Sequence, residues 1–454
     1  MERGTTMPRA QPARGWLLAP IAALCILAYL PTLRQPLLED DYPNLAIARH
    51  YGDPAAWRDL SGSVYRLRAT SEWLMFAAYR EFGLDPAPYY AVAIALHILC
   101  AWLVYALGFW PRVGYRVAAW AAAFFAIYEG HQEAVMWFSA CNELLQFLFG
   151  VAALVCWLHF LWGEKRRGAW YAAALMCLAL ALVSKESAPV FVLLMALPLL
   201  DLQWGATVQK RSATVRDRWL FRRPNSSLSV SSGERWPGSR VPGPIRPKSA
   251  LLALAPFWLL AGAAALSVYA ARGSSFRFQD GSFSLHAPFW RTWPFNLARL
   301  FWFWGWLALA GARRRALPGV AWAALGILPY VFLTYSSRIP SRQFYLASAG
   351  VALVVGFAMA ELRARRAVVI TVCAVVIAQN VGYLWIKKRR QFLQRAEPTQ
   401  ELIAYAKRIK GPVTIRCFPR APLIAEEAVR LGAGRSDIVW DGKAPQGFCY
   451  QAEK

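Results

Sequence analysis

The sequence predicts an all-α polytopic membrane protein with a small α/β appendage at its C-terminus. Three observations predict this fold class: the composition, the arrangement of apolar residues in blocks, and the placement of the positive charges. The chain has 454 residues, of which 57% are hydrophobic and 14% aromatic, and 22 of them are Trp. A soluble protein of this length rarely carries so much apolar sequence.

The apolar residues gather in blocks long enough to cross a bilayer. A hydrocarbon core of about 30 Å needs roughly 20 apolar residues per helix, and several blocks reach or approach that length. We therefore expect about eleven spans, near residues 16–33, 89–110, 115–128, 143–162, 169–184, 188–203, 250–271, 293–311, 317–335, 344–361 and 367–386.

The formal net charge of +25 follows the same topology. Cytoplasmic loops of membrane proteins accumulate Lys and Arg. If the N-terminus is cytoplasmic, every predicted inner loop is basic, and the outer loop around residues 129–142 has no Lys or Arg. An odd number of spans places the C-terminus outside, although the basic run Lys387 to Arg390 argues for an inner tail. No basic stretch is interleaved with aromatic residues as a nucleic-acid groove would be.

The organisation that follows has three parts. Residues 1–15 form a cytoplasmic N-terminus before an uncleaved first span, because no small-residue cleavage site follows that apolar block. Residues 16–386 form the transmembrane domain, with a long first outer loop at 34–88 and a basic inner loop at 204–249 that is too polar to bury a core. Residues 387–454 form the appendage.

The tail has alternating helix and strand patterns. Residues 397–410 and 421–431 have helical periodicity, and residues 412–418 and 437–440 resemble strands. Cys417 and Cys449 both lie in this polar tail. They form a disulfide if the tail faces an oxidising compartment, and unlinked thiols are an equal alternative.

An acidic cluster opens the first outer loop. Glu39, Asp40 and Asp41 lie within about ten residues of the first predicted span. Further along, Tyr65 and Arg66 precede an amphipathic stretch that would lie on the membrane surface. The alternative interpretation is that three acids only solvate a loop.

Two further polar groups fall on the same side. The second outer loop places His131 and Glu133 at the membrane edge, where a polar cap on two helices is the plain alternative. Lys185 and Glu186 lie between two apolar helices with almost no loop to solvate them. Such charges are costly unless they are paired or functional, and a self-satisfied pair at a tight turn is the simpler explanation.

The fifth outer loop adds cations. Arg338 and Arg342 run against the positive-inside trend, and Tyr345 follows them directly. Arg makes forked contacts with phosphate oxygens, although anchoring to lipid headgroups would also explain the pair. Carboxylates from two outer loops and cations from two others suit displacement of an anionic leaving group from a lipid-borne donor.

In this order the motifs resemble those of GT-C glycosyltransferases, membrane enzymes that use polyprenyl-phosphate sugars. The likeness is nearest to the O-mannosyltransferase-like multispan proteins that often carry tetratricopeptide repeats. It covers roughly residues 15–390, although no such repeat is visible in the tail and Leu67, Tyr128, Glu129 and Gln343 depart from the usual pattern. The residues that carry it are Glu39 to Tyr42, Tyr65, Arg66, Gly83 to Asp85, Leu96, His97, His131, Glu133 to Val135, Trp137, Ser184 to Glu186, Arg342, Tyr345 and Leu346.

The resemblance implies inverting transfer of a sugar from a polyprenyl-phosphate donor to an acceptor hydroxyl on the outer face. Asp40 or Asp41 is expected to be the base. Lys185, Arg338, Arg342 and Tyr345 are expected to bind the donor phosphate, and His131 and Glu133 to bind the acceptor or a metal. The supporting residues are expected to be Glu39, Tyr65, Arg66 and Glu186.

Other readings stay open at this point. Oxygen ligands would suit Mg²⁺ or Mn²⁺, and metal independence is equally open. The acceptor is a protein, a lipid or a polysaccharide, and the high Arg and Ala content favours a bacterial inner membrane. A transporter or flippase would carry charges along its spans, whereas these spans are nearly free of charge. A non-catalytic scaffold of the same fold is a further alternative.

Overall fold

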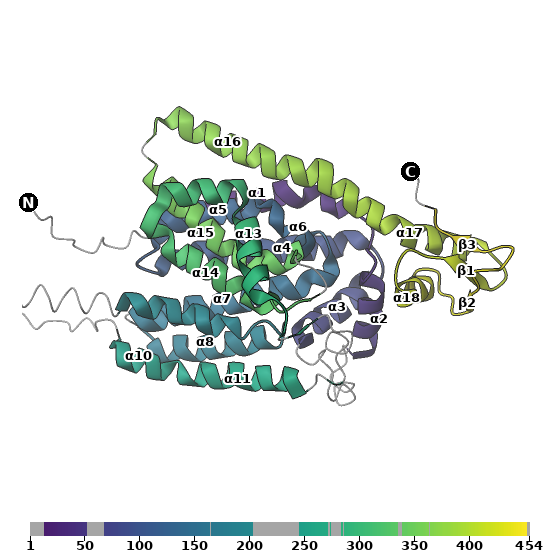
Figure 1. Cartoon of the computed structure of the whole chain (residues 1–454), viewed down its shortest axis with the longest axis horizontal. Coiled ribbons are helices and arrows are strands. Elements are labelled where there is room, and N and C mark those ends of the chain that lie inside the picture. Colours follow the sequence, from purple (N-terminus) through teal and green to yellow (C-terminus); the bar gives the residue numbers. More distant parts are fainter. Residues whose placement is uncertain are drawn as a thin grey trace, which may run out of the picture.

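The computed structural model describes residues 13–51, 68–163, 165–202, 245–270, 273, 283–284, 286–334, 338–362 and 364–451. Most of the predicted basic inner loop lies outside these residues, as do Tyr65 and Arg66. The described chain forms a bundle of helices that run roughly along the long axis of the molecule (Figure 1). The appendage is attached at one end of the bundle.

A helix of the bundle corresponds to each of the predicted spans. The helices are α1 (Leu18–Tyr29), α4 (Pro86–Ala106), α5 (Gly114–Ile127), α7 (Cys141–Trp162), α8 (Arg167–Leu182), the helix Val190–Leu202, α10 (Pro247–Ala253) with α11 (Ala255–Ala270), α13 (Phe289–Ala312), α14 (Leu317–Ile327), α15 (Tyr345–Glu361) and α16 (Arg366–Gly382).

Length and apolar composition identify this bundle as a multi-pass membrane domain. Within the described residues, 6 helices are long and apolar enough to cross a bilayer, the first being Gly15–Arg34 with its short 3₁₀ ends. Three shorter apolar helices, Gly114–Ile127, Arg167–Leu182 and Val190–Leu202, lie among them. The predicted fold class is therefore confirmed.

Small residues let α14 and α15 approach closely at the centre of the bundle. A Cβ added at Gly319 would lie 2.6 Å from the carbonyl oxygen of Gly350, and one added at Gly350 would lie 2.4 Å from the backbone nitrogen of Ala323. Such backbone contact is typical of membrane helices, which gain packing energy rather than hydrophobic energy on association. α15 is the central helix, and most of its residues are buried.

The segments predicted as outer loops fold into short helices at one end of the bundle. The amphipathic stretch of the first loop is α3 (Ala69–Phe82), which ends at Gly83 with φ of 58°, a conformation that favours glycine. The acidic cluster leads directly into α2 (Asp41–Tyr51), a helix that the sequence analysis did not predict. The second loop contributes α6 (Gln132–Val135).

The appendage is the small α/β unit that the tail pattern predicts. It contains α17 (Arg389–Arg408), β1 (Val413–Cys417), α18 (Pro422–Gly432), β2 (Ile438–Trp440) and β3 (Phe448–Cys449). The strands are parallel in the order β2-β1-β3, and β3 is too short to show a pattern in the sequence. A disulfide joins Cys417 to Cys449 and so ties β1 to β3.

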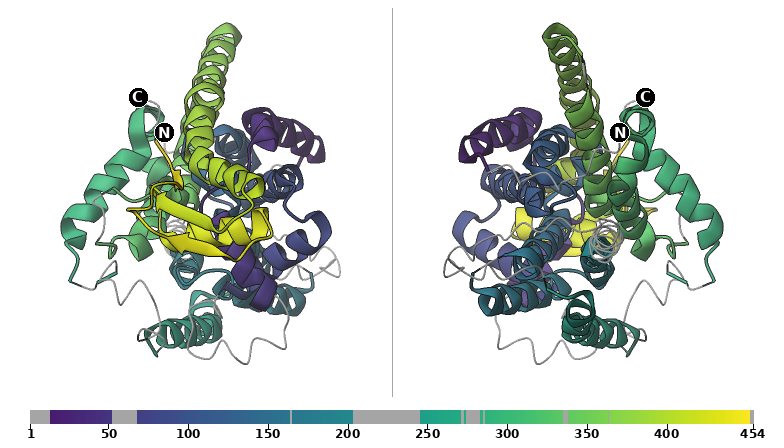
Figure 2. Two further views of the ribbon diagram at one scale, coloured as in Figure 1. Left: turned by 90° about the vertical axis from the view of Figure 1, so that its right-hand side faces the viewer. Right: turned by 90° about the vertical axis from the view of Figure 1, so that its left-hand side faces the viewer.

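The appendage packs on the end of the bundle that carries the acidic cluster. α16 continues through a π-helical turn, Tyr383–Lys388, into α17, and α18 packs on α2 (Figure 2). The Gln400 side-chain amide donates to the hydroxyl of Tyr42 at 2.9 Å. Tail and first outer loop therefore share one face, as an odd number of spans requires.

Candidate functional site

A small cavity lies between the outer helices, and predicted residues from three separate loops line it. Its volume is about 80 Å³. The lining residues are Asp40, Asn44, Arg68, Trp137, Ser139, Ala140, Asn142, Lys185 and Arg342. The structure thus brings together Asp40, Lys185 and Arg342, which lie far apart in the sequence.

The two neighbouring aspartates have different environments. Asp41 is 1% exposed, and its carboxylate accepts hydrogen bonds from the backbone N–H of Leu38 at 2.7 Å and from the N–H and hydroxyl of Ser139 at 2.8 Å and 2.6 Å. Burial raises the pKa of Asp41 to about 6, against these hydrogen bonds. Asp41 therefore ties the start of α2 to the second outer loop and has little capacity left for a substrate.

Asp40 has a different environment, at the wall of the cavity. It lines the cavity, and among the described residues its carboxylate has no hydrogen-bond or ion-pair partner. Burial and the neighbouring Glu39 raise the pKa of Asp40, while Arg342, Arg395 and Arg420 oppose the rise. Of the two residues predicted as the base, Asp40 is the one with the geometry for it.

Glu39 is held by the appendage. Its carboxylate accepts from Arg395 of α17 at 3.1 Å and from Arg420, which precedes α18, at 2.7 Å. Glu39 is 6% exposed, so these contacts neutralise an otherwise buried charge. Glu39 thus joins the residue before Asp40 to the appendage, and neither arginine was predicted from the sequence.

Arg342 and Arg395 share one aromatic ring. The guanidinium carbons of Arg342 and Arg395 lie 4.7 Å and 4.6 Å from the ring centroid of Trp137. Stacking of this kind leaves the in-plane N–H groups of a guanidinium available as donors. The indole N–H of Trp137 is itself buried without an acceptor among the described residues. At the cavity, Arg342 and the indole N–H of Trp137 therefore offer donors that no described residue uses.

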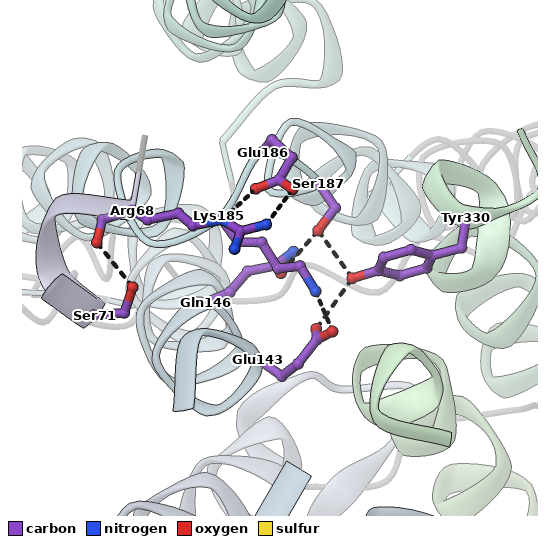
Figure 3. A network of polar contacts seen from close by, with 8 residues as sticks. All are labelled: Arg68, Ser71, Glu143, Gln146, Lys185, Glu186, Ser187 and Tyr330. Carbon is purple, nitrogen blue, oxygen red and sulfur yellow. Dashed lines mark hydrogen bonds and ion pairs between the residues drawn. The ribbon is translucent and has the colours of Figure 1, made fainter. Parts of the chain in front are cut away.

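Lys185 and Glu186 do not pair with each other. The Lys185 ammonium donates to Glu143 of α7, and the Arg68 guanidinium donates two hydrogen bonds, of 3.1 Å and 2.7 Å, to Glu186 (Figure 3). The Tyr330 hydroxyl also donates to Glu143, at 3.1 Å. Lys185 and Glu186 therefore belong to a network that joins four segments of the chain, and the simpler explanation of a local pair at a tight turn does not hold. Lys185 is 4% exposed, and burial lowers its pKa to about 8.

Two predicted residues lie inside the bundle instead. His131 is fully buried, with its Nε2 atom 2.5 Å from the Ser348 hydroxyl, and burial lowers its pKa. The Tyr345 hydroxyl lies 2.7 Å from Nδ1 of His97. Neither side chain lines the cavity, so the predicted contacts of His131 with acceptor or metal and of Tyr345 with phosphate have no counterpart there. Both residues are packing partners of one aromatic cluster.

Two further predicted residues, Glu133 and Arg338, do not line the cavity. Glu133 accepts from the backbone N–H of Arg342 at 3.2 Å and so fixes the loop that carries this arginine. Arg338 is exposed and outside the set of lining residues.

The donor set does not suit a divalent cation. Within the described residues no three His, Cys, Asp or Glu side chains come together as a metal site. Among the described residues that line the cavity, Asp40 is the one carboxylate, and it shares the space with Arg68, Lys185 and Arg342. Mg²⁺ and Mn²⁺ bind where oxygen ligands dominate, so this lining does not fit either ion.

The two arginine contacts with Glu39 are predicted to hold the appendage on the bundle. The double variant Arg395→Gln/Arg420→Gln leaves Glu39 buried without a cation, and we expect trypsin to release the segment after residue 387 about ten-fold faster, a loss of roughly 1.4 kcal/mol. Limited proteolysis of purified protein measures this. Arg408→Gln, at an exposed site on α17, is the control. Equal cleavage rates for both variants would show that the ion pairs do not hold the appendage.

Comparison with known proteins supports the fold assignment. No family model and no curated protein sequence matches the chain. Among solved structures, the chain is similar to the oligosaccharyltransferase AglB from Archaeoglobus fulgidus in complex with an inhibitory peptide and a dolichol-phosphate, with a TM-score of 0.50 and 13% identity. The match covers 93% of this chain and 64% of that one.

Two further solved structures are similar at lower scores. One is the same archaeal enzyme tethered with an acceptor peptide, with a TM-score of 0.49 and 13% identity; the match covers 96% of this chain and 61% of that one. The other is ArnT from Cupriavidus metallidurans bound to undecaprenyl phosphate, with a TM-score of 0.45 and 14% identity; the match covers 95% of this chain and 87% of that one. The chain thus spans about two thirds of the archaeal enzyme. The chain has the GT-C type of membrane fold.

Proposed function

We propose that this chain is an inverting glycosyltransferase that moves a sugar from a polyprenyl-phosphate donor to an acceptor hydroxyl at the cavity. The observation that carries the proposal is the unpaired carboxylate of Asp40, which shares one cavity with the cations Arg68, Lys185 and Arg342. A carboxylate and several cations at one point are what displacement of an anionic leaving group requires. The GT-C fold adds support.

The reaction is a single displacement. The hydroxyl oxygen of the acceptor attacks the anomeric carbon while Asp40 accepts the proton of that hydroxyl. The bond between that carbon and the phosphate oxygen breaks, and its electron pair leaves with the polyprenyl phosphate. Attack opposite the leaving group inverts the anomeric configuration, and the proton leaves the cavity from Asp40.

The cations serve the leaving group. A departing phosphate is a weak base, so charge stabilisation matters more than proton donation. Arg342 has its guanidinium stacked on Trp137 and its N–H edges unused by any hydrogen bond among the described residues. Lys185 and Arg68 are already paired with carboxylates. They therefore contribute to the electrostatic potential at the cavity more than to direct contacts with the phosphate.

The orientation in the membrane belongs to the proposal. The cavity, the acidic cluster and the appendage share one end of the bundle, and the positive-inside rule puts that end outside the cytoplasm. We infer a cytoplasmic N-terminus, a periplasmic C-terminal appendage and a bacterial inner membrane. The Cys417–Cys449 disulfide supports an oxidising compartment for the appendage.

Arg342→Gln tests the role of the cations. A hydrogen bond to a charged group contributes about 1.5–3 kcal/mol, so the variant is expected to lose about 10–100-fold in kcat/KM for the lipid-phosphate donor. The assay follows release of polyprenyl phosphate by purified protein supplied with a panel of polyprenyl-phosphate sugars. Arg80→Gln, which removes an exposed arginine of α3 paired with its neighbour Glu81, is the matched control. Equal loss in both variants would remove Arg342 from the site.

A further inference from the structure

A second, larger cavity lies beside the contact between α2 and α18. Its volume is about 380 Å³, and it is lined by Ala46, Arg49 and His50 of α2 and by Glu427, Arg430 and Leu431 of α18. Each helix contributes residues at positions i, i+3 and i+4, which lie on one helical face. The two faces therefore oppose each other across the cavity, and none of these residues belongs to the Asp40 cavity.

Cationic side chains dominate the lining. Arg49 lies over the ring of Tyr79 at 5.6 Å and has no acidic partner among the described residues. Arg430 pairs with Glu427 on its own helix at 2.7 Å, but its side chain stays 55% exposed. Both guanidinium groups therefore keep N–H donors for a further oxyanion.

Glu427 provides an independent indication of a ligand. It is 7% exposed, and its Oε2 atom is buried without a hydrogen-bond partner among the described residues. A buried acceptor left unpaired costs about 1–3 kcal/mol, so a donor from a bound molecule would relieve the cost. Hydroxyl and amine groups are the donors that match a carboxylate oxygen.

The cavity walls are firmly attached. The α2 residues Leu45 and Ala48 and the α18 residue Ala428 belong to one buried apolar cluster. This cluster fixes the distance between the two helices beneath the cavity. The cavity is therefore part of the docked arrangement of the appendage on the first outer loop.

We propose that this cavity binds the acceptor, through a phosphate or carboxylate group held by Arg49 and Arg430 and a neighbouring hydroxyl or amine that donates to Glu427. Because it names the acceptor's chemistry, the proposal rests on the proposed function. α2 connects the two cavities, since Asn44 lines the first and Arg49 the second. Asn44 and Arg49 are about 7.5 Å apart along the axis of α2 but lie on different sides of the helix, so an acceptor held at Arg49 must extend around α2 to reach Asp40, which calls for an acidic saccharide of several units.

Binding measured without donor tests the proposal independently of transfer. The full chain in phosphatidylcholine nanodiscs is titrated with glucose 6-phosphate, glucuronate and neutral glucose. We expect both acidic sugars to bind at least ten-fold more tightly than glucose. The Arg49→Gln/Arg430→Gln variant is expected to lose that preference, whereas Arg49→Lys/Arg430→Lys, which conserves both charges, and Arg408→Gln, an exposed control, are expected to keep it.

A lipid source of the oxyanion is distinguished in the same system. Phosphatidylglycerol in the nanodisc is expected to displace glucose 6-phosphate if the acceptor is an anionic lipid, and to leave its binding unchanged if the acceptor is a soluble saccharide. Equal affinity for glucose and for the acidic sugars, or an unchanged preference in the Gln double variant, would overturn the proposal. Full transfer by Asp40→Asn would overturn the proposed function while leaving this binding intact, so the two failures are distinguishable.

Discussion

Replacing Asp40 by Asn is expected to reduce the rate of sugar transfer by about 10²–10⁴-fold, the usual contribution of a positioned general base. Asn has the same shape but does not accept a proton. Asp40 has no other partner among the described residues, so the substitution breaks no structural contact there. Donor binding is expected to change little, which separates a loss in kcat from a loss of fold.

The matched control is Asp85→Asn. Asp85 caps α4 by accepting from the N–H of Ala87 at 3.2 Å, and Asn caps a helix equally well. We expect wild-type activity at this position. If Asp85→Asn lost as much activity as Asp40→Asn, the loss would reflect the loop and not a base.

The pH profile gives the same test a direction. Burial and Glu39 raise the pKa of Asp40 above its ordinary 3.8. A base acts only when it is deprotonated, so wild-type kcat is expected to fall as the pH falls through that raised pKa. The residual activity of Asp40→Asn is expected to lack this limb.

Breaking the buried ion pair between Glu143 and Lys185 is expected to have the largest effect on stability. Glu143→Leu leaves the Lys185 ammonium buried without its carboxylate, at a cost of about 3–5 kcal/mol. Their side chains are 2% and 4% exposed, so water does not replace the lost partner. Thermal unfolding in detergent, followed by circular dichroism, measures the shift.

A second variant separates the pair from its parts. Glu143→Leu/Lys185→Met removes both charges and fills a similar volume, and such replacements are often neutral or stabilising. We expect the double variant to recover most of the lost stability while losing donor-dependent transfer, because Lys185 lines the cavity. A single variant as stable as wild type would show that Lys185 finds another partner.

The helices were predictable because the bilayer imposes their length and composition. Each predicted span has a helix, and the charge pattern alone places Asp40, Lys185 and Arg342 on one side. The appendage was predictable for a different reason: its helical and strand periods alternate in a polar tail. β3 was missed because two residues carry no period.

The partners of the charged residues were not predictable. Lys185 bonds a residue 42 positions away and Glu186 one 118 positions away, so their adjacency in the sequence suggested a false local pair. The role of Arg395 depends on the docking of the appendage, for which the sequence has no signal. Asp at the start of α2 with Pro43 in its first turn was a helix signal that the acidic cluster obscured.

His131 and Tyr345 show where motif likeness and geometry diverge. Both occur at the expected order in the chain, but His131 ends a short 3₁₀ segment and Tyr345 begins α15, and each packs into an aromatic cluster with His97 and Phe125. The sequence placed both residues near the ends of predicted spans. It had no signal for whether their side chains face the cavity or the core of the bundle.

Transfer by the purified chain tests the central claim most directly. The protein in nanodiscs receives a radiolabelled polyprenyl-phosphate sugar and an acidic saccharide acceptor, and both products are isolated. We predict release of one polyprenyl phosphate for each glycoside formed, inverted anomeric configuration in the glycoside, and about 10²–10⁴-fold slower formation of both products with Asp40→Asn. Donor turnover that is unchanged in Asp40→Asn, or a glycoside of retained configuration, would contradict the account.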